Sequence, residues 1–206
     1  MAKIDLKKEL KELYSPSAKE VTVVDVPPMN FLMIEERGDP NTSPGFKAAI
    51  EALYSVSYAL KFMAKEETPE RDYVVMPLEG LWWFEGKEGF DLVDKGSWCW
   101  TAMIMQPEFI TEEMVARALE EVAGKKDLLA LSALRFERFH EGLAAQILHI
   151  GPYSAEGPTI EGLHRFIAEH GYGMRGKHHE IYLSDPRRVA PEKLKTVIRQ
   201  PIAKRV

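Results

Sequence analysis

The spacing of apolar residues predicts four helices along the chain. Leucines at helical spacing predict a short amphipathic helix over residues 5–14. The serine–proline pair at residues 43–44 is typical of a helix start and opens the longest helix. Thr111 precedes two glutamates, which a helix dipole favours in its first turn, and a last helix is predicted over residues 158–170.

Apolar and β-branched runs between these helices predict the strands. The predicted strands are residues 21–26, 31–35, 73–76, 81–84, 98–105, 134–139, 143–150 and 179–184. A turn at residues 86–89 is expected to join two of them into a hairpin. This mixture of strands and helices predicts an α+β fold.

The order of elements in the first half of the chain returns in the second half. An apolar strand ends in glycine over residues 31–38 and again over residues 144–151, and a proline–glycine pair then opens a helix. We interpret this as an internal duplication, in which two half-sheets related by a pseudo-twofold axis enclose a cleft. The predicted division of the single domain is an N-terminal helical extension (1–20), a first repeat (21–105), a connecting helix (106–130) and a second repeat (131–206).

All four tryptophans lie on the two strands of the predicted hairpin. Trp82 and Trp83 are on the first strand, and Trp98 and Trp100 on the second. Residues two apart share a face of a strand, so Trp98 and Trp100 point the same way and the hairpin brings at least three indoles together. The cluster is either a wall facing a ligand or part of the core. Cys99 is expected to point away from it, as a small buried residue and not a nucleophile.

The strand over residues 179–184 places an acidic residue in an apolar run. Glu180 and Tyr182 share one face, and Ile181 lies on the other. If Ile181 faces the helices, Glu180 and Tyr182 face the cleft. Burying a lone carboxylate is costly, so Glu180 is either exposed at an edge, paired, or poised for a cation.

A rigid turn precedes the last helix and carries two more candidate residues. Tyr153 lies at its tip, and Glu156 follows three residues later. An ordinary solvated loop is the alternative interpretation of this segment.

Composition removes several classes of function. The chain has 206 residues, a net charge of −5 and one cysteine, which excludes a disulfide framework and a multi-cysteine zinc site. The adjacent His178 and His179 point to opposite faces of a strand, so loose surface histidines are expected and no metal site. No phosphate-binding glycine loop is present, and no cofactor is expected. Without a long apolar run or a signal peptide, a cytoplasmic location away from the membrane is predicted.

The C-terminal segment carries a charge opposite to that of the whole chain. Residues 187–206 contain seven basic residues and one acidic residue. A solvated segment with some packing positions is favoured over a nucleic-acid arm, so no nucleic-acid partner is expected. The oligomeric state is left open.

Several spaced motifs together resemble the GyrI-like small-molecule-binding domain family. They are Gly151-Pro152-Tyr153, then Glu180-Ile181-Tyr182-Leu183-Ser184-Asp185-Pro186, and then Pro191-Glu192-Lys193-Leu194 and Thr196-Val197-Ile198-Arg199-Gln200-Pro201. The resemblance implies a tandem pair of βαβββ units, the SHS2 module, with a central pocket that binds lipophilic and often cationic molecules. It implies that Glu180 lies in that pocket with Tyr182 beside it. The tryptophan-rich segment is similar to a subgroup that includes cyclopropanoid cyclopropyl hydrolases.

Three functions follow from this resemblance and from the residues. The first is sequestration of lipophilic, cationic or planar aromatic xenobiotics by an aromatic cage of Trp82, Trp83, Trp98, Trp100, Tyr153 and Tyr182 around Glu180. The second is hydrolysis of cyclopropane-containing DNA-alkylating compounds, with Glu180 and Glu156 as acid and base in an unassigned order and Tyr153 as an alternative proton donor. The third is a regulatory adaptor that lacks a DNA-binding half.

Overall fold

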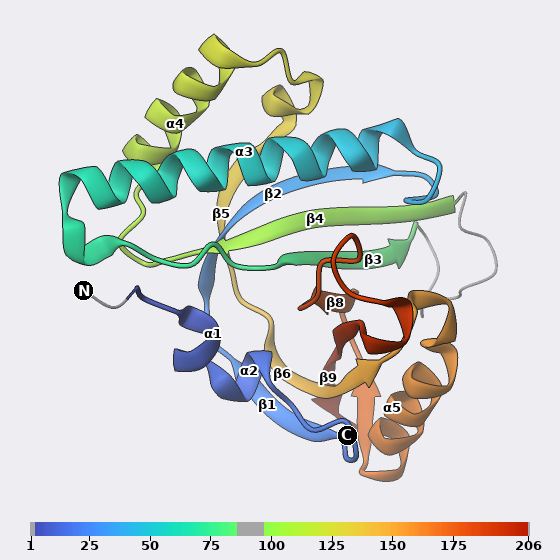
Figure 1. Cartoon of the computed structure of the whole chain (residues 1–206). Coiled ribbons are helices and arrows are strands. Elements are labelled where there is room, and N and C mark those ends of the chain that lie inside the picture. Colours follow the sequence, from blue (N-terminus) through green and yellow to red (C-terminus); the bar gives the residue numbers. More distant parts are fainter. Residues whose placement is uncertain (1–2, 86–96, 206) are drawn as a thin grey trace.

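The computed structural model describes residues 3–85 and 97–205 and has an α+β fold (Figure 1). The α-helices are α1 (Leu6–Glu9), α2 (Lys11–Tyr14), α3 (Pro44–Glu67), α4 (Glu112–Lys125) and α5 (Gly157–Glu169). The strands are β1 (Thr22–Val26), β2 (Met29–Arg37), β3 (Leu78–Phe84), β4 (Trp98–Gln106), β5 (Arg135–Phe139), β6 (Gly142–Ile150), β7 (Tyr172–Met174), β8 (His178–Tyr182) and β9 (Lys195–Lys204). Short 3-10 helices are η1 (Pro69–Arg71), η3 (Leu129–Ala133), η4 (Tyr153–Ala155) and η5 (Pro191–Lys193).

The strands form one antiparallel sheet in which the two halves of the chain exchange strands. The order is β1-β6-β9-β8-β3-β4-β2-β5, and β7 pairs with β9. The early strand β1 pairs with β6, and the later strand β5 pairs with β2. The order is therefore symmetric about the β8–β3 pair, as two related units would make it. The duplication itself and its residue boundaries stay a prediction.

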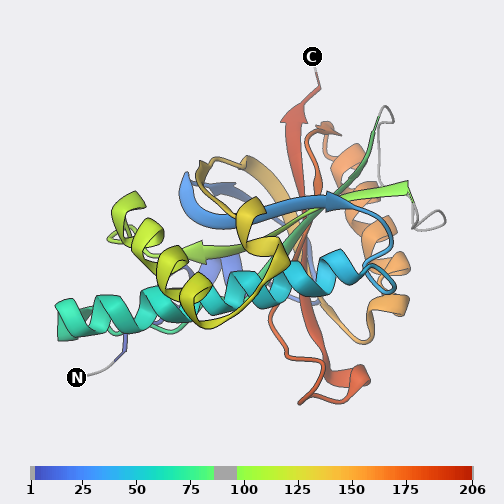
Figure 2. The ribbon, with the colours of Figure 1, turned by 90° about the horizontal axis from the view of Figure 1, so that it is seen from above.

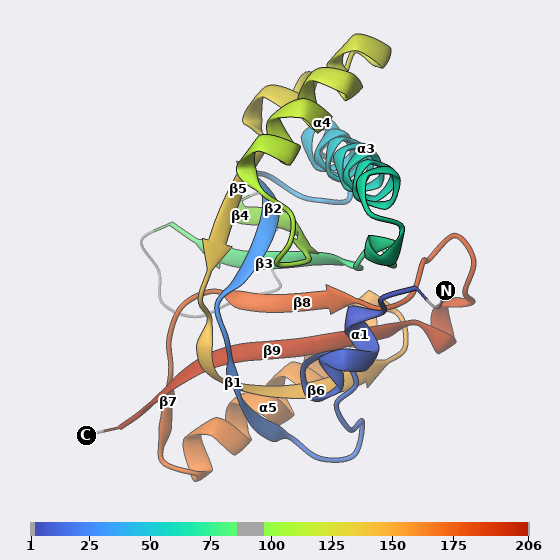
Figure 3. The same ribbon diagram turned by 90° about the vertical axis from the view of Figure 1, so that its left-hand side faces the viewer.

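Two helices cover the same face of this sheet, one on each half. Phe46 of α3 contacts Trp100 of β4, and Ile198 of β9 packs in the core formed with α5. Trp100 pairs with Trp82, and Ile198 pairs with Glu180, so all four side chains lie on the face that we call the helix side. Figure 3 shows α3 and α4 beside the half that contains β2 and β4, and α5 beside the other half. Figure 1 shows α3 across the upper part of the molecule and α5 at the lower right, and Figure 2 shows the same helices from above.

The predicted helix starts are confirmed by their caps. The hydroxyl of Ser43 accepts a hydrogen bond from the backbone N–H of Phe46, and Thr111 caps α4 through Met114 in the same way. The N-terminal helix is split into α1 and α2 at Leu10, instead of running unbroken over residues 5–14. Within the described residues, no helix has both the length and the apolar character needed to span a membrane.

Two predicted features of the strands are wrong. Residues 73–76 form no strand, because Tyr73 makes only an isolated bridge to Ile4 and β3 begins at Leu78. The solvated C-terminal segment is also wrong over residues 196–202, since β9 is buried there between β6 and β8, although most of the basic residues of this segment are exposed. Arg199 of β9 is fully buried, where Glu141 balances its charge. The turn predicted at residues 86–89 lies outside the described residues.

Candidate functional site

The candidate site lies at the centre of the sheet, on the helix side of β8 and β3. His178, Glu180 and Tyr182 alternate along β8, and Gly80 of β3 is the partner of Glu180. Ile181 points to the opposite face. The side covered by α3 and α5 is therefore also the side that carries Glu180, whereas the case considered from the sequence was that Ile181 faces the helices.

Glu180 is buried but keeps some contact with solvent, with an exposed fraction of 8%. The hydroxyl of Tyr182 donates a hydrogen bond to Glu180 Oε2 over 2.7 Å, and His178 Nε2 lies 3.2 Å from Oε1. Burial raises the pKa of Tyr182 well above its ordinary value, and the negative charge of Glu180 raises it further. Tyr182 therefore keeps its proton and acts as a hydrogen-bond donor to the carboxylate.

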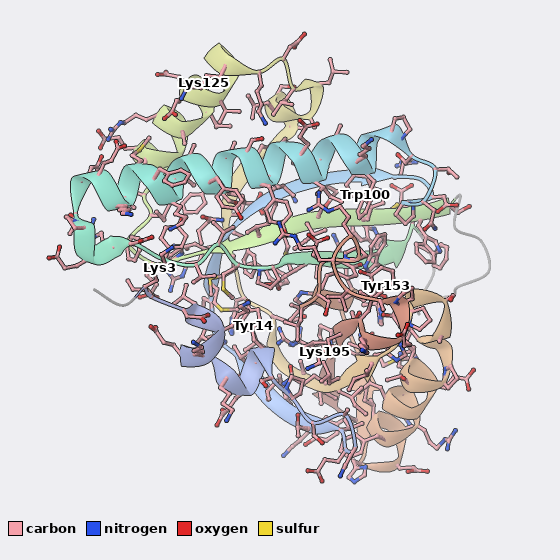
Figure 4. The ribbon with its side chains drawn as sticks, viewed as in Figure 1. Lys3, Tyr14, Trp100, Lys125, Tyr153 and Lys195 are labelled. Atoms are coloured by element: carbon pink, nitrogen blue, oxygen red, sulfur yellow. The ribbon has the colours of Figure 1, made fainter. Side chains whose placement is uncertain are left out.

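Tyr153 and Glu156 join this cluster from the segment that starts α5. The ring of Tyr153 makes an edge-on contact with that of Tyr182 at 5.6 Å between centroids, and Figure 4 shows Tyr153 at the start of α5. Burial raises the pKa of Tyr153 to about 12, and the charges of Glu156 and Glu180 act in the same direction. Tyr153 is 40% exposed, whereas Glu156 is buried at the N-cap of α5, where the helix dipole favours a carboxylate. The solvated-loop interpretation is therefore wrong for Glu156.

Three tryptophans extend the cluster along the helix side. Trp82 and Trp98 contact edge-on at 5.4 Å, and Phe46 lies 5.6 Å from Trp82 and 4.9 Å from Trp100. All three indoles are buried in the main core, and Figure 4 shows Trp100 under α3. A Cβ on Gly80 would lie 2.8 Å from the indole nitrogen of Trp82, so only glycine lets this indole lie over the strand opposite Glu180. Trp82, Trp98 and Trp100 thus belong to the core, and Trp82 is also next to Glu180.

The fourth tryptophan is not brought to this cluster. Trp83 lies on the opposite face, where the Nζ atom of Lys177 is 3.2 Å from its ring centroid. Cys99, the partner of Trp83 on β4, is buried and points away from the other indoles, as predicted.

Directly behind the site, on the opposite face, lies a buried charged network that we call the rear network. His179 lies between Glu79, at 2.9 Å, and Glu141, also at 2.9 Å. Tyr14 donates to Glu79 over 2.7 Å, and Arg199 donates to Glu141 over 3.1 Å. All five side chains are buried, and they connect the N-terminal extension to both halves of the sheet. In Figure 4, Tyr14 is labelled on α2 below the sheet centre.

Electrostatics in the rear network balance two cations against two carboxylates. The neighbouring Glu141 and Glu79 overcome the burial of His179 and raise its pKa to about 9. His179 and Arg199 likewise overcome the burial of Glu141 and lower its pKa to about 2. The expectation of surface histidines is wrong for His178 and His179, which are both buried, although they do point to opposite faces. The sequence signal for this network is that two of its charged residues, Glu79 in β3 and Arg199 in β9, lie within otherwise largely apolar strands.

The other candidate sites in the described chain have fewer functional groups than the cluster around Glu180. No group of three or more histidine, cysteine or acidic side chains among the described residues is placed to hold a metal ion. Two surface hollows, of about 480 and 400 Å³, lie at residues 123–131 and between β6 and the start of α5. Glu180 lines neither of these two hollows.

A family model for the GyrI-like small molecule binding domain matches residues 19–203. This chain belongs to the GyrI-like family. Its fold matches an uncharacterized conserved protein from Listeria innocua with 42% identity and a TM-score of 0.89, over 98% of this chain and 100% of the other. Two hydrolases from Listeria innocua match with 40% and 37% identity and TM-scores of 0.86 and 0.84. Each match again covers 98% of this chain and 100% of the other. No curated protein matches the chain.

A more distant solved structure has the same fold. The EcmrR C-terminal domain is 12% identical, with a TM-score of 0.55, and the match covers 90% of this chain and 98% of that domain. At this identity the likeness concerns the fold alone.

Proposed function

We propose that this GyrI-like protein binds planar aromatic and cationic small molecules at Glu180, and so sequesters or detoxifies xenobiotics in the cytoplasm. One observation carries the proposal. Glu180 is a nearly buried carboxylate among aromatic rings, and among the residues that the structure describes its two hydrogen-bond partners come from its own strand. Such a carboxylate does little to hold separate elements together, but it is well suited to receive a positive charge.

The surroundings of Glu180 explain what kind of ligand would bind. The face of an aromatic ring attracts a cation by about 0.5–2 kcal/mol, and a carboxylate strengthens that attraction as water leaves. Flat walls such as Tyr153 and Tyr182 accept many planar molecules, because stacking demands little of their hydrogen-bond pattern. Broad recognition is therefore expected instead of one substrate.

Tyr153 is the proposed point of entry. It is the most exposed member of the cluster, and its ring rests edge-on against Tyr182. A ligand ring that takes the place of the Tyr153 ring would stack on Tyr182 and reach Glu180.

Two planar probes of similar shape test the role of the charge. Proflavine is a tricyclic cation at pH 8, whereas acridine is neutral there, and binding of either can be followed by quenching of tryptophan fluorescence. Glu180→Gln should weaken proflavine binding about tenfold, equivalent to roughly 1.4 kcal/mol, and leave acridine binding nearly unchanged. Glu120→Gln, on the exposed face of α4, is the matched control. An equal affinity of wild type and Glu180→Gln for proflavine would refute the role of this carboxylate.

Hydrolysis is the second candidate, and the two Listeria innocua hydrolases favour it. They are 37% and 40% identical to this chain over nearly its whole length. The candidate substrates are compounds in which a strained cyclopropane is conjugated to a dienone. Glu180, Glu156 and Tyr153 supply two carboxylates and a phenol in one cluster, which are the groups that such a reaction needs.

The proposed reaction adds one water molecule. The oxygen of water bonds to a cyclopropane carbon, and the ring C–C bond breaks. Its electron pair moves into the dienone, which becomes a phenol. One glutamate takes a proton from water, while the other glutamate or Tyr153 gives a proton to the former carbonyl oxygen. The two variants Glu180→Gln and Glu156→Gln should each slow turnover about 100-fold.

Mass spectrometry decides whether this turnover occurs. Protein incubated with a cyclopropane-containing alkylator should yield a product heavier by one water, faster than buffer alone. If wild type gives no more product than buffer, hydrolysis of this substrate class is excluded and the binding proposal is judged on the proflavine result alone.

A further inference from the structure

Exposed aromatic rings lie on α3 as well as in the site at Glu180. Among the described residues, the large aromatic side chains that count as exposed are Tyr58, Phe62 and Tyr153, with exposed fractions of 48%, 54% and 40%. Single exposed apolar side chains are common, but a contiguous group marks a binding surface. Tyr153 belongs to the site at Glu180, so the other two raise the question of whether they extend it.

Tyr58 and Phe62 belong to a ladder of three rings on α3. Tyr54, Tyr58 and Phe62 are spaced four residues apart and so share one face of the helix. The ring centroids are 6.4 Å apart for Tyr54 and Tyr58 and 6.5 Å apart for Tyr58 and Phe62. The ring planes differ by only 32° and 29°. The three rings, which we call the α3 ladder, thus form a nearly even strip about 12 Å long.

The first ring of the α3 ladder adjoins the candidate site. Burial raises the pKa of the Tyr54 hydroxyl, and the nearby backbone of Leu78 offsets part of this rise. Leu78 lies two residues before Gly80 on β3, hence on the same helix side and about 7 Å along the strand from the partner of Glu180. Tyr54 also contributes to the electrostatic surroundings of Tyr153. From Tyr54 the ladder runs away from α5, along the part of α3 that Figure 1 shows crossing the upper half of the sheet.

The two ends of this surface differ in charge. Glu180 supplies a carboxylate at one end. At the other end, the Nζ atom of Lys61 lies 5.8 Å from the ring centroid of Phe62 and is paired with Asp72. A second positive charge on a ligand would therefore meet a resident cation next to Phe62, whereas an uncharged aromatic ring would not.

We infer that the α3 ladder is a second binding strip, which takes the uncharged distal rings of an elongated ligand whose cationic head is held at Glu180. This inference rests on the proposed binding at Glu180 and narrows the ligand class to rod-like aromatic molecules with one charged end. Each added ring of such a ligand contacts one further ring of the ladder.

A series of amidines with one, two and three linearly joined phenyl rings tests the inference. All three carry the same cationic head, so their affinities differ only through the added rings. For wild type, each added ring should tighten binding about fivefold. Phe62→Ala should abolish the gain from the third ring, and Tyr58→Ala the gains from the second and third. Met174→Ala, which removes a side chain of similar exposure on β7, is the control and should leave every gain intact.

The outcomes separate this inference from the proposal on which it rests. Because Tyr58 and Phe62 are exposed, their variants should keep the wild-type affinity for the one-ring amidine. If the third ring still tightens binding in Phe62→Ala as much as in wild type, the α3 ladder is not a binding strip, although binding at Glu180 stands. If the one-ring amidine binds wild type and Glu180→Gln equally, the proposal at Glu180 itself fails.

Discussion

Two buried histidines stand back to back on β8, and the glutamates that they contact come from different parts of the chain. His178 and Glu180 face the helix side, and within the described part of the chain the hydrogen bonds of Glu180 reach residues two positions away on the same strand. His179 faces the rear network, and its partners Glu79 and Glu141 are 100 and 38 residues away in the chain. The described contacts of Glu180 therefore add little to tertiary structure, while those of His179 join distant parts of the chain.

The two groups also differ in how completely they are enclosed. Every side chain of the rear network is buried, and Arg199 extends it to the backbone of Leu13 in the N-terminal extension. Glu180 keeps a small exposed fraction, and Tyr153 beside it is partly in solvent. A closed, charge-balanced network stabilises one arrangement, whereas an accessible carboxylate with local partners can exchange them for a ligand. The following predictions test this difference.

Removing a charge from the rear network should have the largest effect. Arg199→Met leaves Glu141 with one fewer cation in the interior and should lower the free energy of unfolding by about 3–5 kcal/mol. Urea unfolding measures the loss. Arg187→Met, which removes an exposed arginine, is the control and should change the midpoint little.

Should Arg199→Met fail to fold, a second variant keeps the test open. Arg199→Met combined with Glu141→Leu removes both charges, and it should be more stable than the single Glu141→Leu variant, which leaves Arg199 without its carboxylate. A loss for Arg199→Met no greater than that for Arg187→Met would show that the rear network does not hold the fold together.

The pH dependence of stability should carry the signature of His179. Its pKa of about 9 lies above the ordinary value of 6.5, so the protonated form is favoured by folding. This contribution is complete below pH 6.5 and is lost as the pH rises through 9, by on the order of 3 kcal/mol. Glu141 acts oppositely, because its pKa of about 2 means that its contribution is lost as the pH falls below 4.5.

Urea unfolding at several pH values between 6 and 9.5 measures the alkaline loss of stability. His179→Gln has no proton to lose there, so its stability should change much less over this range. Parallel slopes for wild type and His179→Gln would rule out a protonated His179 as the source. Glu180→Gln is the control on the other face and should keep the wild-type slope.

The sequence was sufficient for most of the fold. The caps at Ser43 and Thr111 fixed the helix starts, because they act through residues three positions away. Strand alternation likewise placed Trp98 and Trp100 on one face and Cys99 on the other. These features are local, and local patterns are what a sequence displays.

The errors arose where distant residues decide the outcome. A run of basic residues indicated a solvated C-terminal segment, but Arg199 lies in the interior because Glu141, 58 residues earlier, neutralises it. Alternation showed that Glu180 and Ile181 face opposite sides, but not which side carries the helices, because that depends on sheet pairing. Trp83 was grouped with the other indoles by sequence proximity alone, although alternation turns it to Lys177.

The smallest expected difference comes from two matched tyrosines, one on each face. Tyr14 donates to Glu79 and Tyr182 donates to Glu180, both over 2.7 Å, so each Tyr→Phe variant removes one hydroxyl and one bond of equal length. Tyr14→Phe leaves a donor missing in a fully buried network and should cost about 1–3 kcal/mol of unfolding free energy. Tyr182→Phe should cost about 1 kcal/mol or less, because Glu180 retains contact with water and with His178. Equal losses in urea unfolding would mean that Glu180 is as much a part of the folded framework as Glu79, and the contrast between the two faces would disappear.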